Sequence, residues 1–209
     1  GFEIAFQPTF SREKFGDLLL YATNAKKRIA VNGDLANQSA EMKKITDTFY
    51  TDFISVESAP KFEFFRNKEI VEKFLNSDVE TTRPDIDLPP IDDNLVPNED
   101  YAVLVVGASH PLKLWVQFPS IVEYIAEHLQ RKIVLVGRGE RDRAAIASLK
   151  QKSKNQVFVD LCDSTTLLQL AQLLGRAKLV VSNDTAAVHL AAIQGAPTVC
   201  ITLGAHAFR

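Results

Sequence analysis

Three segments of the sequence combine glycine, hydroxyl and charged side chains in an order that suits a phosphorylated ligand. The first covers residues 107–115, where Gly107 and Ser109 suit a loop whose backbone approaches an anion. Lys113 follows in the same loop, and its mobile ammonium could contact phosphate. The alternative interpretation is a solvated lysine in an ordinary surface loop, with Trp115 as a packing residue.

The second segment is Gly137-Arg138-Gly139-Glu140. The glycines permit a tight turn, and the carboxylate of Glu140 could accept hydrogen bonds from both hydroxyls of a ribose, as acidic residues do in dinucleotide-binding folds. The alternative is that Glu140 only stabilises the start of a helix through the helix dipole. These residues alone leave both interpretations open.

The third segment runs from Ser182 to Ala192, where an apolar strand pattern leads straight into a helix of small residues. Asp184 or Thr185 can cap that helix and leave its first-turn amides directed at a ligand. Those amides and the helix dipole would stabilise a diphosphate without a metal ion. The small side chains of Thr185, Ala186 and Ala187 would let the ligand approach closely. The alternative is capping without any ligand.

The elements around these segments predict a doubly wound α/β domain over residues 101–209. Apolar runs alternate with helical patterns, which indicates a parallel sheet of at least five strands covered on both faces. The expected strands are residues 101–106, 132–136, 157–159, 178–181 and 198–201, and the expected helices are residues 119–130, 140–152, 165–175 and 185–194. Each of the three segments follows a strand, so all three should open onto the same edge of the sheet.

Residues 1–75 predict the remainder of a second α/β domain, with strands at 2–7 and 28–31 and helices from a cap at Ser11 to about residue 25 and at 61–75. The first helix should bury Phe15, Leu18, Leu19 and Ala22, and the second should have one apolar side made of Phe65, Val71, Phe74 and Leu75. Residues 76–100, rich in proline and aspartate, predict a linker. The chain opens on a strand pattern without a methionine, which suggests part of a longer protein.

The composition restricts the partners. The chain has 209 residues, 46% of them hydrophobic, and a formal net charge of -2, which fits a globular protein without bulk attraction to nucleic acid. Cys162 and Cys200 lie far apart without a nearby His/Cys cluster, so we expect two buried free thiols and no zinc site. No membrane-length apolar window or signal pattern is present, which favours a cytoplasmic setting.

The order of these motifs resembles a known family. The segments concerned are Lys113-Leu114-Trp115, Gly139-Glu140, 167–174, 180–185, 189–192 and Gly195-Ala196-Pro197. In this spacing they are similar to glycosyltransferase family 9, the ADP-heptose:lipopolysaccharide heptosyltransferases. The resemblance implies a GT-B architecture of two Rossmann-like domains, the N-terminal one incomplete here. It also implies inverting transfer that requires neither a metal nor a cofactor.

The resemblance also implies roles for single residues. Lys113 would meet the donor phosphates and sugar, and Glu140 the adenosine ribose. Asp184 and Thr185, with the amides of Ala186 and Ala187, would hold the sugar and diphosphate. Ala186 stands where the family commonly has glycine.

The resemblance also implies a role for His189, the position of the general base and the binding partners. His189 would reach the phosphates or support the loop, and the general base would precede Gly1. The implied partners are a nucleotide-diphosphate sugar of the ADP-heptose type and a glycan or glycolipid acceptor, met at most peripherally at the inner face of the cytoplasmic membrane. Two alternatives remain, namely a nucleotide-binding module without catalysis and another GT-B-like enzyme such as a sugar-nucleotide epimerase.

Overall fold

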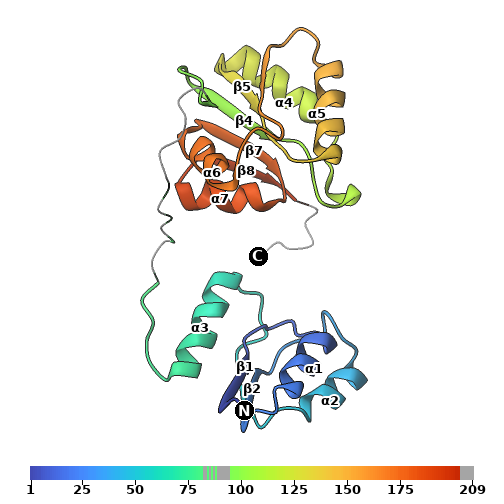
Figure 1. Cartoon of the computed structure of the whole chain (residues 1–209), viewed down its shortest axis with the longest axis vertical. Helices are drawn as coiled ribbons and strands as arrows, with labels where there is room; N and C mark the ends of the chain where they lie inside the picture. The colour runs from blue at the N-terminus through green and yellow to red at the C-terminus, as the bar shows by residue number, and fades with distance from the viewer. Residues whose placement is uncertain (82–83, 85, 87, 89–94, 203–209) are drawn as a thin grey trace. The chain divides into compact units, whose positions relative to one another are not determined.

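The computed structural model of the protein describes residues 1–81, 84, 86, 88 and 95–202 (Figure 1). The chain divides into two compact units between residues 82 and 83, and each unit has its own parallel sheet. We refer to them as unit 1 and unit 2. The segment predicted as a linker includes residues 82–83, 85, 87 and 89–94, which lie outside the described residues, as do residues 203–209.

Unit 2 contains a five-stranded parallel sheet in the order β6-β5-β4-β7-β8. Its strands are β4 (Tyr101–Val105), β5 (Lys132–Leu135), β6 (Phe158–Asp160), β7 (Leu179–Asn183) and β8 (Thr198–Ile201). Every neighbouring pair is parallel. The predicted parallel sheet of at least five strands is therefore confirmed.

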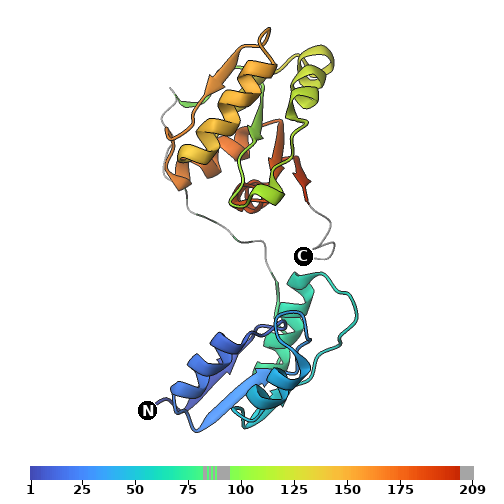
Figure 2. The same cartoon turned by 90° about the vertical axis from the view of Figure 1, so that its right-hand side faces the viewer.

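Helices cover both faces of this sheet, and alternate residues of β4 pack into a separate core on each face. One core joins Tyr101, Val103 and Val105 to α6 (Leu167–Arg176) and α7 (Ala186–Gln194). The other joins Ala102 and Leu104 to α4 (Phe118–Tyr124), its π-helical continuation η3 (Ile125–Leu129) and α5 (Glu140–Lys152). Figure 2 looks onto the face that α5 crosses.

The strand order creates a topological switch point in unit 2. From β4 the chain first adds β5 and β6 on one side, and then crosses to β7 and β8 on the other. The helices that follow β4 and β7 consequently lie on opposite faces, and the loops at the carboxyl ends of these two strands diverge. In open parallel sheets, ligands bind in the crevice that such a divergence leaves.

Unit 1 has three parallel strands in the order β1-β2-β3, namely β1 (Ile4–Gln7), β2 (Lys27–Val31) and β3 (Asp52–Ile54). Helices α1 (Lys14–Ala22) and α2 (Ala40–Asp47) lie on one side of the sheet and α3 (Glu63–Leu75) on the other (Figure 1). On the α3 side, Phe6 stacks on Phe74 with ring centroids 4.2 Å apart. Neither α2 nor β3 was predicted from the sequence.

The prediction for α1 was wrong at its start and on its buried face. The helix begins at Lys14 after Glu13, while the Ser11 hydroxyl donates to Asp34 at 3.0 Å and so connects two loops instead of capping. Phe15, Leu18, Leu19 and Ala22 are exposed, and α1 buries Asp17 and Leu20. Helix α3 likewise buries Arg66 and Ile70, whereas Phe65, Val71 and Leu75 are exposed and Phe74 is half-buried.

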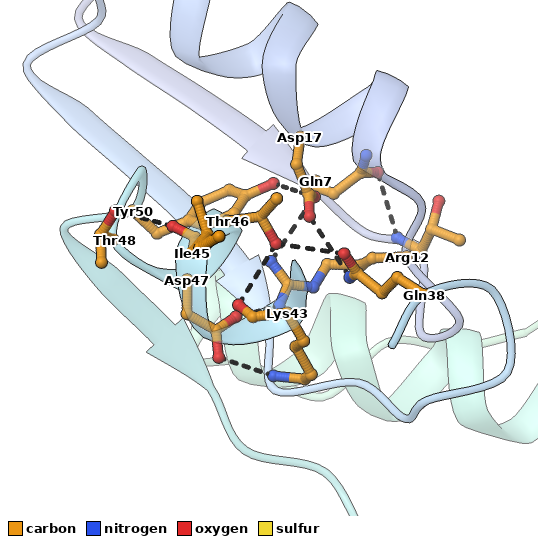
Figure 3. A network of polar contacts seen from close by, with 11 residues as sticks. Gln7, Arg12, Asp17, Gln38, Lys43, Ile45, Thr46, Asp47, Thr48 and Tyr50 are labelled. Carbon is orange, nitrogen blue, oxygen red and sulfur yellow. Dashed lines mark hydrogen bonds and ion pairs between the residues drawn. The ribbon is translucent and has the colours of Figure 1, made fainter. Parts of the chain in front are cut away.

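The buried face of α1 is set by a charged network (Figure 3). The guanidinium of Arg12, in the loop after β1, pairs with Asp47 and lies 3.5 Å from Asp17 Oδ1. The side chains of Arg12 and Asp17 are both fully buried. The Tyr50 hydroxyl donates to Asp17, and burial raises the pKa of that phenol. Lys43 pairs with the half-buried Asp47 at 2.8 Å.

Candidate functional site

A cavity of about 650 Å³ opens at the carboxyl edge of the sheet in unit 2. The loops and helix starts that follow β4, β5, β6 and β7 form its wall, which includes the switch point between β4 and β7. Six of the predicted site residues line it: Gly107, Ser109, Glu140, Thr185, Ala186 and Ala187. The three polar segments of the sequence therefore do meet at one edge of the sheet, as their positions after strands predicted.

The start of α7 forms one wall of the cavity. Thr185 is the N-cap, and its hydroxyl accepts the N–H of Ala187 at 3.4 Å, so the structure selects Thr185 over Asp184 as the capping residue. The first N–H groups of a helix have no partner within the helix, and they carry its positive end. This wall is therefore electropositive without any charged side chain.

Lys113 and Asp184 form an ion pair beside the cavity. Lys113 ends the 3₁₀ turn η2 (Pro111–Lys113), and its Nζ lies 2.8 Å from Asp184 Oδ2. Both side chains are about one-third exposed, at 32% and 33%, so a ligand can reach them. They line a smaller hollow of about 70 Å³, while the next residue, Thr185, lines the large cavity. This pair was not predicted from the sequence.

Asn183 fixes the loop after β4 to the end of β7. Its side-chain amide donates to the carbonyls of Val106 and Gly107 at 2.9 and 3.2 Å, and its Oδ1 accepts the N–H of Trp115 at 3.3 Å. Asn183 is fully buried. Asn183 received no role from the sequence, although an asparagine that ends an apolar strand is a signal that could have revealed one.

Further residues of the cavity wall were also missed. Thr165, Thr166, Leu167 and Leu170 come from the loop after β6 and the start of α6, where Thr166 and Gln169 form a capping box. Their place in the cavity wall could not be predicted from the sequence, because it depends on the strand order that puts β6 beside β5. Arg138, Arg141 and Asp142 also line the cavity.

Two predicted site residues lie apart from both hollows. Gly139 adopts φ +83 in the turn before α5, and His189 is exposed on α7; neither is among the described residues that line the two cavities.

The expectation of two buried thiols was wrong. Cys200 is exposed because β8 is an edge strand, and Cys162 is half-buried after β6.

No group of three or more His, Cys, Asp or Glu side chains lies where it could hold a metal ion in the described part of the chain. Within the same residues, no helix is both long and apolar enough to cross a membrane.

Comparison with known families decides the assignment. The sequence model of glycosyltransferase family 9 (heptosyltransferase) matches residues 18–203. The chain belongs to glycosyltransferase family 9. Comparison with curated protein sequences gives no significant match.

Solved structures of this family share the fold. A family 9 glycosyltransferase from Veillonella parvula has a TM-score of 0.66 at 14% identity, with 95% of this chain and 56% of that one covered. E. coli heptosyltransferase WaaC with ADP has a TM-score of 0.63 at 17% identity, with 96% and 60% covered. E. coli ADP-heptose heptosyltransferase II has a TM-score of 0.54 at 16% identity, with 94% and 61% covered.

The parallel, Rossmann-like sheets of this family 9 chain thus resemble part of the GT-B heptosyltransferases. The chain spans about 56–61% of the length of these three structures.

Proposed function

We propose that this family 9 chain carries the donor-binding part of a glycosyltransferase. The reaction would transfer a sugar, heptose or a related one, from a nucleotide diphosphate to lipopolysaccharide or another cell-envelope glycan, with inversion and without a metal ion. One observation carries the proposal: the electropositive start of α7, with Thr185, and the carboxylate of Glu140 line the same cavity at the switch point of the sheet.

The proposed site assigns the diphosphate to the start of α7. The peptide N–H of Ala186 would donate to its oxygens, and that of Ala187 would exchange its 3.4 Å hydrogen bond to the Thr185 hydroxyl for one to the diphosphate. The small side chains leave room for a close approach. Lys113 would exchange its pairing with Asp184 for the phosphates, which would leave Asp184 to contact the sugar. Glu140 would accept hydrogen bonds from the ribose hydroxyls.

In the proposed reaction, a deprotonated hydroxyl of the acceptor attacks the anomeric carbon of the donor sugar. The bond from that carbon to the diphosphate oxygen breaks, and the leaving diphosphate gains negative charge. Lys113 and the start of α7 would stabilise this charge more in the transition state than in the bound donor. A single donor of this kind contributes about 2 to 4 kcal/mol in other enzymes.

The proposed donor is a nucleotide-diphosphate sugar of the ADP-heptose type. This choice rests on the family and on its structural relatives from E. coli, which hold ADP and ADP-2-deoxy-2-fluoro heptose. The proposed acceptor is a glycan or glycolipid, met in the cytoplasm and at the inner face of the cytoplasmic membrane.

Calorimetric titration of the 209-residue chain with ADP and with UDP tests the proposal. We expect weak but saturable binding, with ADP preferred, and no turnover of a sugar donor by this chain alone. Failure of both nucleotides to bind would refute the proposed donor site. In a complete enzyme, product analysis would separate glycosyl transfer from epimerisation, because only transfer consumes an acceptor.

A further inference from the structure

The turn that precedes α5 is held by carboxylates of the protein itself. The N–H of Arg138 donates to Asp142 Oδ2 at 2.8 Å, and the N–H of Gly139 donates to Asp163 Oδ1 at 2.7 Å. Asp163 also pairs with Arg143 of α5, and the hydrogen bond from Gly139 lowers the pKa of the Asp163 carboxyl. Both peptide donors of this turn are thus occupied in the folded protein.

The side chain of Asp142 also fills a slot between two strand ends. A Cβ added at Gly107, after β4, would lie 1.9 Å from Asp142 Oδ1. A Cβ added at Gly137, after β5, would lie 2.7 Å from Asp142 Cβ. The Asp142 side chain therefore leaves no room for a Cβ at either glycine, and it packs between the loops that follow β4 and β5.

The position of Asp142 in α5 explains why it can do this. Asp142 is the third residue of the helix, and a side chain there can reach back to a free N–H before the helix. The N-cap, Gly139, has no side chain that could take part. The positive end of the helix also stabilises the negative charge of Asp142.

We infer that Asp142 is a positioning residue of the nucleotide site, which holds Glu140 in the cavity wall by locking the 137–139 turn to the end of β4. The inference rests on the proposed function, because it assigns the ribose to Glu140. Asp142 acts through the turn: the residue that follows the turn, at the first position of α5, is Glu140. Both residues line the cavity.

The test is a double-mutant cycle with ADP as the probe and calorimetry as the readout. We expect Asp142→Ala to weaken ADP binding about tenfold in the wild-type background, and by less than about twofold when Glu140→Ala is already present. Asp142→Asn keeps an acceptor oxygen for the N–H of Arg138, so we expect affinity within about threefold of wild type. Asp142→Ser replaces the alanine variant if that variant does not fold.

The matched control is Asp100→Ala, which removes a carboxylate paired with Arg131 at 2.9 Å near the opposite end of β4. It should leave ADP affinity unchanged. The inference is overturned if Asp142→Ala retains wild-type affinity while Glu140→Ala loses it, or if the two losses multiply. If wild type binds neither ADP nor UDP, the proposed function fails and the positioning role fails with it.

Discussion

Replacing Arg12 with methionine removes the cation from the buried network of unit 1 and keeps a long side chain in its place. Asp17 is then left fully buried with two neutral hydrogen-bond donors, the Tyr50 hydroxyl and, at 3.5 Å, the Gln38 side-chain amide. Asp47, in contrast, is one-third exposed and keeps Lys43. Breaking a buried pair in this way costs about 3–5 kcal/mol, because one charge stays desolvated and uncompensated. We expect that loss in the free energy of unfolding, measured by urea denaturation followed by circular dichroism.

A second variant and a surface control identify the cause. Arg12→Met with Asp17→Asn removes both charges and keeps an oxygen for Tyr50, so we expect it to regain at least half of the loss. Lys26→Met breaks a pair with Glu3 at 2.7 Å whose side chains are 77% and 76% exposed, and should cost less than about 1 kcal/mol. The reasoning is refuted if Arg12→Met costs no more than this surface variant, or if the double variant is less stable than Arg12→Met alone.

Three further predictions concern charged side chains. Lys113→Ala should weaken ADP binding about tenfold or more with no loss of secondary structure, since a hydrogen bond to a charged group contributes about 1.5–3 kcal/mol. Unchanged affinity by calorimetry would exclude Lys113 from the phosphate site. Glu140→Ala should weaken binding of ADP more than binding of inorganic diphosphate, which lacks a ribose, and equal effects on both would contradict the ribose assignment. Lys61 and Lys73 lower the pKa of Glu69. The stability that this carboxylate contributes is therefore present above its unfolded pKa and lost as pH falls through the lower folded value. In acid titrations, the free energies of unfolding of wild type and Glu69→Gln should differ less at low pH than at neutral pH.

The sheet of unit 2 was predictable because its signals are local. Each buried strand is an unbroken apolar run, such as residues 101–106, and polar residues or glycine mark each strand end. Parallel strands bring those ends to one edge, so the meeting of Gly107, Glu140 and Thr185 followed from chain order alone.

The failures have a different physical origin. Apolar spacing predicted that α1 buries Phe15 and Leu19, but burial is decided by Asp17, whose partners Arg12 and Tyr50 come from other elements. No periodicity of one helix can reveal such a tertiary pair. The contact of Asp142 with two glycines was hidden for the same reason, since it depends on the lateral order of β4 and β5.

The internal carboxylates that hold the 137–139 turn also determine the step at which the turn loses its conformational entropy. When a glycine-containing loop becomes ordered only around a ligand, the entropy lost in that ordering makes the binding free energy less favourable. The cost is about 0.5–1.5 kcal/mol for each immobilised side chain. Here Asp142 and Asp163 order the turn when the chain folds, so the entropic cost is subtracted from the stability of unit 2. In the proposed site, a nucleotide would therefore meet a turn that is already ordered, and its binding would not have to offset the entropy of ordering that turn.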